Sequence, residues 1–146
     1  MPAVCQRWIA VAALLGATGV ALGAYGAHGL SGSLERWGYA GDDLAHRVDI
    51  FHTAVRYQMI HALALVALGL ALVHGSPRAW HVAAWAMLGG VLVFSGLLYA
   101  LALAGPDWKW VGAVVPFGGG AMIVGWLALA VGALSRNARP PSPSCE

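Results

Sequence analysis

The chain carries unusually little charge. Only 10% of its 146 residues are Asp, Glu, Lys or Arg, and the formal net charge at pH 7 is +2. The few basic residues are scattered along the chain rather than gathered in a run. Such a distribution does not attract a polyanion, so the sequence does not indicate a nucleic-acid-binding protein.

Cysteine is also scarce. The two cysteines, Cys5 and Cys145, lie near opposite ends of the chain and match no metal-binding or redox spacing. If the chain crosses a membrane an even number of times, both ends lie on one side. A disulfide between these two residues then stays open as an alternative to two free thiols.

Catalytic motifs are missing too. The sequence contains no Ser-His-Asp arrangement with a nucleophile elbow, no phosphate-binding loop and no pair of carboxylates inside an apolar segment. We therefore expect no enzymatic activity and no bound cofactor.

What the chain has in abundance is apolar sequence. Hydrophobic residues make up 60% of it, and they occur in blocks about twenty residues long, which is the length that crosses a bilayer as a helix. The sequence predicts an all-α integral membrane protein, an up-down-up-down four-helix bundle in the plasma membrane (the bacterial inner membrane). The predicted single domain covers residues 1–134, followed by a disordered tail at 135–146. The predicted spans are residues 8–30, 51–73, 80–103 and 110–134.

The first and second spans have particular starts. The first block could serve as a signal peptide, but it continues to Leu30 and three similar blocks follow, so we expect a retained span. Before the second span, Leu44, Val48 and Phe51 recur at helical spacing and predict an amphipathic helix at the interface that continues into the span. Four basic residues fall on each predicted side, so the positive-inside rule leaves the orientation open.

Polar residues are concentrated toward one end of the predicted bundle. Alternating spans bring the end of the first, the start of the second, the end of the third and the start of the fourth into one leaflet. Pro116 lacks an N–H and is expected to leave the carbonyl of Gly112 without a partner inside the fourth helix. The predicted polar cluster comprises Tyr25, His28, Gln58, His61, Ser95, Tyr99 and Pro116.

Three interpretations of this cluster are open. The one we favour is interhelical packing, in which hydrogen bonds fix how the helices meet. A second makes His28 and His61 a proton relay or a site for a small polar solute, as in a transporter or channel. A third makes them ligands of a haem or metal; no haem-attachment motif, no pair of histidines at i and i+4 inside a span, and no carboxylate within a span supports it.

Small residues predict where helices approach closely. Glycines recur at spacings of three and four in the first span, and three consecutive glycines follow Pro116 in the fourth. Such smooth faces serve contacts within one chain or between copies, so the expected partners are the lipid bilayer and either a second copy or another membrane protein. The predicted packing glycines are Gly16, Gly19, Gly23, Gly26, Gly118, Gly119 and Gly120.

Several segments also resemble a known family. Residues 23–30 (Gly-Ala-Tyr-Gly-Ala-His-Gly-Leu), 57–65 (Tyr-Gln-Met-Ile-His-Ala-Leu-Ala-Leu), 94–99 (Phe-Ser-Gly-Leu-Leu-Tyr) and 116–119 (Pro-Phe-Gly-Gly) with Gly125-Trp126 are similar to domain-of-unknown-function family 423. That family includes YgdD-like and YwdK-like small inner-membrane proteins. The resemblance covers all four spans in order and implies a multi-pass plasma-membrane protein, but no biochemical role and no functional residues.

This sequence departs from the family pattern at two positions. Leu97 stands where a small polar residue is expected after Phe-Ser-Gly, and Val115 stands where a threonine usually precedes the proline. Both changes remove a hydroxyl from the polar cluster, which favours packing over transport.

Overall fold

The computed structural model describes residues 1–75, 77–104 and 106–137, and within them the chain is helical without strands. The four long helices are α1 (Ala3–His28), α3 (Gly41–Ala71), α4 (Arg78–Leu103) and α5 (Val115–Asn137). Shorter segments connect them: α2 (Leu30–Arg36), η1 (Leu72–His74) and η2 (Pro106–Ala113). The predicted all-α class is confirmed.

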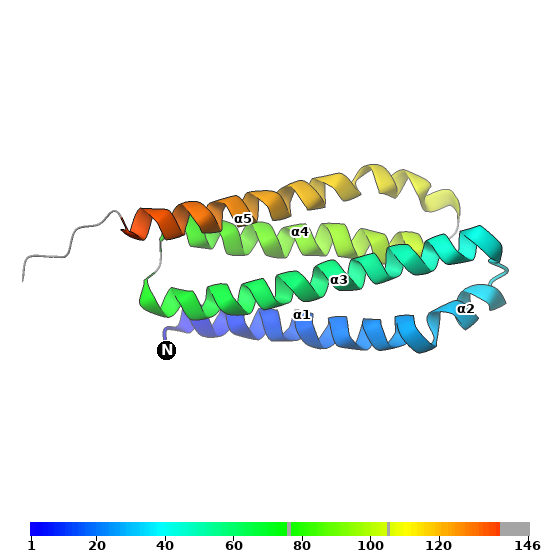
Figure 1. Ribbon diagram of the computed structural model, residues 1–146, viewed down its shortest axis with the longest axis horizontal. Coiled ribbons are helices and arrows are strands. Elements are labelled where there is room, and N and C mark those ends of the chain that lie inside the picture. The colour runs from blue at the N-terminus through cyan, green and yellow to red at the C-terminus, as the bar shows by residue number, and fades with distance from the viewer. Residues whose placement is uncertain (76, 105, 138–146) are drawn as a thin grey trace, which may run out of the picture.

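Four segments are long and apolar enough to span a membrane: Ala3–His28, Gly41–Ala71, Arg78–Leu103 and Trp110–Ser135. A helix satisfies its own backbone hydrogen bonds, which is the condition for crossing hydrocarbon. A helix of 26 residues, such as α1, is about 39 Å long and exceeds the ~30 Å hydrocarbon core. The long helices alternate in direction, so the start of α1 lies at the same end as the start of α4 (Figure 1).

Packing follows chain order. The extensive contacts join α1 to α3, α3 to α4, and α4 to α5. As a result α1 and α5 lie at opposite edges of the molecule (Figure 1). Helices α3 and α4 are in the interior of this arrangement and each has a neighbour on both sides, so their polar side chains can reach more partners than those of α1 or α5.

Two apolar clusters hold the ends of the molecule. Near the N-terminus, Trp8, Leu65 and Met87 belong to a buried cluster that draws on α1, α3 and α4. Cys5 is also fully buried there, whereas Cys145 lies outside the described residues. At the opposite end Leu34 and Phe51 pack with neighbours from α2, α3 and α4.

The helix boundaries agree with the prediction in one place and differ from it in two. As predicted, the amphipathic segment continues into the second span, and together they form one uninterrupted helix, α3. The first span was predicted to end at Leu30, but α1 ends at His28, and Leu30 begins the short helix α2, which buries Leu30 and Leu34 completely. At the C-terminal end α5 continues to Asn137, so the first residues of the predicted tail are helical, and residues 138–146 lie outside the described chain.

The prediction that Pro116 leaves the carbonyl of Gly112 unpaired inside the fourth helix is wrong. The fourth span begins with the 3-10 segment η2, and α5 starts only at Val115. Pro116 is therefore in the first turn of α5, where an N–H has no intrahelical acceptor anyway. Because Gly112 belongs to η2 and not to α5, the proline breaks no hydrogen bond inside an α-helix.

Candidate functional site

The polar residues form three separate sites rather than one cluster. We call them the Gln58 site, the His61 site and the Arg47 site. Each is built around a residue of α3 that is at least nine-tenths buried, with exposed fractions of the whole residue of 5%, 4% and 7% respectively. Each joins α3 to a different set of neighbours.

The Gln58 site connects three helices. The amide nitrogen Nε2 of Gln58 donates to the carbonyl of Leu15 at 2.8 Å and to Oγ1 of Thr18 at 2.9 Å, both on α1. On the other side, the hydroxyl of Tyr99 on α4 donates to Oε1 of Gln58 at 2.8 Å. Both amide hydrogens and the amide oxygen therefore have partners, which is the arrangement that a buried amide requires.

A cavity lies beside Gln58. It has a volume of about 210 Å³ and is lined by residues of α1, α3 and α4, among them Thr18, Gln58, Ser95 and Tyr99. Ser95 is 1% exposed, and its Oγ has no hydrogen-bond partner within the part of the chain that the structure describes. The structure thus brings together three of the predicted residues, Gln58, Ser95 and Tyr99, with an unpaired hydroxyl at the cavity wall. Thr18 was missed, although it lies one residue before the packing glycine Gly19.

The His61 site connects α3 to α5. Nδ1 of His61 lies 2.9 Å from the carbonyl oxygen of Tyr57, which can only accept, so this nitrogen carries the hydrogen. Nε2 then accepts a hydrogen bond from Nε1 of Trp126 at 3.2 Å. Both ring nitrogens of this neutral tautomer are occupied by protein groups. Trp126 was not predicted to belong to the polar cluster, although Gly125-Trp126 is one of the segments that resemble the family.

His28 does not join His61, which corrects the predicted pairing. His28 is exposed at the C-terminal end of α1. A Cβ on Gly26 would lie 3.1 Å from the ring of His52, so the end of α1 lies beside the first half of α3. His28 is consequently at the level of about residue 50, roughly 16 Å along the helix axis from His61.

Two further members of the predicted cluster also lie apart from it. Tyr25 is 36% exposed and packs edge-to-face against Phe51, with ring centroids 5.9 Å apart. Pro116 is exposed at the start of α5. Of the seven residues predicted to lie together, the structure brings Gln58, Ser95 and Tyr99 to one cavity and places the others elsewhere.

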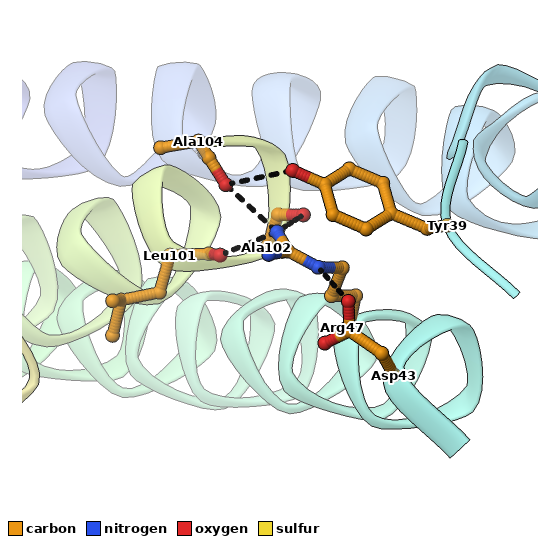
Figure 2. A network of polar contacts seen from close by, with 6 residues as sticks. All are labelled: Tyr39, Asp43, Arg47, Leu101, Ala102 and Ala104. Carbon is orange, nitrogen blue, oxygen red and sulfur yellow. Dashed lines mark hydrogen bonds and ion pairs between the residues drawn. The ribbon is translucent and has the colours of Figure 1, made fainter. Parts of the chain in front are cut away.

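The Arg47 site was missed by the sequence interpretation. Nη1 of Arg47 donates to three backbone carbonyls at the end of α4: Leu101 at 3.3 Å, Ala102 at 3.2 Å and Ala104 at 2.8 Å. These contacts lie around the end of α4, as Figure 2 shows. The last carbonyls of a helix have no intrahelical donor and carry partial negative charge, so a cation from a neighbouring helix satisfies both needs.

Two other groups complete the Arg47 site. The guanidinium carbon lies 3.7 Å from the ring centroid of Tyr39, a cation–π geometry, and Nε lies 3.4 Å from a carboxylate oxygen of Asp43 (Figure 2). The hydroxyl of Tyr39 lies 3.5 Å from the carbonyl of Ala104, which makes it at most a weak donor. One signal was available in the sequence: Arg47 lies three residues after Leu44 and four before Phe51, so it shares their apolar face.

The predicted packing glycines fall into three groups. A Cβ on Gly19, Gly23 or Gly26 would meet side chains of α3 at 2.6–3.3 Å, and one on Gly118 would lie 2.5 Å from the backbone nitrogen of Phe94. A Cβ on Gly119 would make only ordinary contact with the Phe94 ring, at 3.8 Å. Gly16 and Gly120 have no atom within 4 Å of that position, so they are not close-packing sites in this chain. Close approaches that the sequence interpretation missed lie at Gly69, Gly90, Gly125 and Gly132.

The described residues offer no grouping suited to a metal. No set of three or more His, Cys, Asp or Glu side chains lies close enough together in residues 1–75, 77–104 and 106–137. The haem interpretation needed His28 and His61 at one depth, and they are separated.

Comparison with known proteins gives a consistent result. The family described as "Protein of unknown function (DUF423)" matches residues 22–119. A UPF0382 membrane protein of Staphylococcus saprophyticus is 37% identical over 125 residues, covering 86% of this chain and 94% of that protein. YwdK of Bacillus subtilis, also named a UPF0382 membrane protein, is 35% identical over 79% of this chain and 85% of its own. A UPF0382 membrane protein of Schizosaccharomyces pombe is 35% identical over 83% and 96%. No solved structure matches.

Proposed function

We propose, from the premise that the chain belongs to the DUF423 family of membrane proteins, that it is a small accessory protein without catalytic activity. The chain is a multi-pass protein of the inner membrane, and the biochemical role of its relatives is unknown. In this proposal its buried polar residues hold the four spans in one fixed arrangement, and the outer surface meets lipid and a protein partner.

The observation that carries the proposal is that both amide hydrogens and the amide oxygen of Gln58 are hydrogen-bonded to other groups of the protein. Its amide binds two groups of α1 and one of α4, so it acts as a bridge and has no N–H left for a substrate. Both nitrogens of His61 are occupied in the same way. Polar groups satisfied by their own protein favour a packing role, because a transport or catalytic site needs donors and acceptors that its substrate can reach.

An accessory role implies a partner, either a second copy or a different membrane protein. Helix α5 offers a surface for it, since Phe117, Ile123 and Leu127 are more than 60% exposed. Crosslinking in native membranes through a single cysteine at Phe117 would separate the two, because a second copy gives a symmetrical homodimer band and a different protein gives a heavier or lighter product. Cys5 and Cys145 are both replaced by alanine, so that the cysteine at position 117 is the only one in the chain.

The packing role is tested with Gln58→Ala in purified protein. Three hydrogen bonds are lost, and at ~0.6 kcal/mol each in membrane proteins the free energy of unfolding should fall by about 2 kcal/mol. Proteoliposomes of the wild-type chain should show no flux of protons or of small neutral solutes above that of empty liposomes. Flux in the wild-type chain, abolished by Gln58→Ala without loss of stability, would contradict the packing role.

One observation favours a second candidate, the binding and passage of a small neutral solute. The cavity beside Gln58 has several times the ~30 Å³ that one water occupies, and its lining residue Ser95 has a buried hydroxyl without a partner in the described chain. No charged side chain lines the cavity, which favours a neutral solute. Solute-driven swelling of proteoliposomes that Ser95→Ala abolishes, and that the exposed control Ser135→Ala leaves unchanged, would support this candidate over the first.

A further inference from the structure

An outward-facing groove runs between α1 and α4 at the end of the molecule that carries the N-terminus. Its volume is about 540 Å³, well above that of the cavity beside Gln58. Apolar side chains line most of it, among them the aliphatic side chains of Val4, Val11 and Leu88. From Val4 to Val11 the wall follows about 10 Å of helix, a length that suits a segment of an acyl chain.

Two tryptophans form part of the groove. Trp8 of α1 and Trp85 of α4 meet edge-to-face, with ring centroids 5.0 Å apart, and connect the two helices beneath the opening. Trp85 remains 66% exposed, so its ring is available to a molecule lying in the groove. Tryptophan favours the headgroup level of a bilayer, which places this part of the groove near the membrane surface.

The groove carries one cation near that surface. Arg7, in the second turn of α1, lines it on one side, and His81, in the first turn of α4, lines it on the other. Arg7 is exposed and forms no ion pair or hydrogen bond with another described residue. The charge of Arg7 is therefore free to pair with a ligand.

Acidic residues do not oppose this charge. In the described parts of the chain every Asp and Glu belongs to α2, the first half of α3 or η2, at the opposite end of the molecule. The groove thus combines a cation that no described acidic residue opposes, at the headgroup level, with an apolar body below it. That pattern matches an amphiphile with an anionic head.

We propose that this groove binds an anionic phospholipid, with the phosphate group at Arg7 and one acyl chain against Val11 and Leu88. An arginine recognises a phosphate through charge-assisted hydrogen bonds, and a lipid of the surrounding leaflet reaches the groove by lateral diffusion. A second copy of the chain is a poorer occupant, because a two-fold contact through this face would bring two Arg7 side chains together. The proposal is independent of the accessory role described above.

The head-group part is tested on the full-length protein in neutral detergent. Phosphatidylglycerol and phosphatidylcholine with identical acyl chains are titrated, and binding is followed by native mass spectrometry. One surface arginine contributes about a fivefold preference for an anionic lipid, so phosphatidylglycerol should bind about fivefold more tightly. Arg7→Gln should abolish this preference, whereas Arg56→Gln, at an exposed arginine without a partner in the described chain and outside the groove, should leave it unchanged.

The acyl-chain part is tested by filling the groove. Ala10 lines it and is exposed, so Ala10→Trp should weaken binding of both lipids; Ala13→Trp, exposed on the same helix but outside the groove, is the matched control. Circular dichroism and thermal unfolding establish that each variant is folded, and the arginine pair decides the question if Ala10→Trp is not. Equal affinity for the two lipids, or equal losses in the Arg7 and Arg56 variants, would overturn the proposal.

Discussion

Arg47 offers the sharpest test of how the helices are held together. Its side chain is 9% exposed and binds the carbonyls at the end of α4, whereas its ion-pair partner Asp43 is 58% exposed. The relevant comparison is between Arg47→Ala, Arg47→Lys and Asp43→Ala. Arg56→Ala, at an exposed arginine without a partner in the described chain, is the control.

The expected magnitudes follow from the contacts. Nη1 has two hydrogens for three carbonyls, so two bonds can form at full strength, and hydrogen bonds to a charged group contribute about 1.5–3 kcal/mol each. Arg47→Ala also leaves buried carbonyls unpaired, and we expect the free energy of unfolding to fall by about 3–5 kcal/mol. Arg47→Lys keeps the charge without the planar fork and should lose about half as much. Asp43→Ala removes only an exposed i, i+4 pair and should lose less than about 0.5 kcal/mol.

The assay is SDS-induced unfolding in mixed micelles, followed by far-ultraviolet circular dichroism. The expected order of destabilisation is Arg47→Ala, then Arg47→Lys, then Asp43→Ala, with Arg56→Ala close to wild type. Equal losses for Arg47→Ala and Asp43→Ala would show that the ion pair is the main interaction. That result would refute the assignment of Arg47 as a donor to the end of α4.

Other predictions concern the contacts between neighbouring helices. Gly118→Ala should destabilise the protein by about 1–3 kcal/mol in the same assay, because its Cβ would meet the Phe94 backbone at 2.5 Å, while Gly120→Ala, with open space around it, should stay within about 0.5 kcal/mol of wild type. Ser95→Ala removes a hydroxyl that binds no described residue, so the free energy of unfolding should change by less than about 0.5 kcal/mol. A decrease in the free energy of unfolding close to that of Gln58→Ala would mean that the hydroxyl has a partner. Trp126→Phe removes the bond to His61 and should cost about 0.6 kcal/mol in the unfolding assay, with no effect expected if that bond does not form in the membrane.

The fold could be predicted because its determinants are local. Four apolar blocks of sufficient length can satisfy their backbone only as helices, and short connections force neighbouring spans to alternate. The start of α5 was misjudged for a different reason. A proline between two apolar stretches can lie inside a helix or begin one, and the choice depends on η2, whose packing against α4 the sequence does not reveal.

The sequence could predict at which depth of the bundle the site residues lie, but not in which direction around its helix each side chain points. Antiparallel spans bring Gln58 and Tyr99 to one level, and the structure pairs them. His28 also falls at the correct end, yet its direction was not considered. Gly26 faces α3, and His28, two residues later, is turned by about 200° around the helix and so points away. The glycine spacing that predicted the packing face therefore already excluded His28 from it.

Arg47 could not be found by looking for polar residues inside spans, because its partners are backbone carbonyls of another helix. Arg47 and Gln58 are eleven residues apart, close to three full turns, so they lie on nearly the same face of α3. His61 follows Gln58 by three residues on the adjoining face. The three buried polar side chains therefore form one line along α3, and each reaches a different place: the end of α4, the facing sides of α1 and α4, and α5.

An apolar contact alone would let these helices slide or rotate in lipid, where no hydrophobic force fixes their register. Directional bonds at three depths of a single helix remove that freedom, which explains why polar groups are retained where burying them is costly.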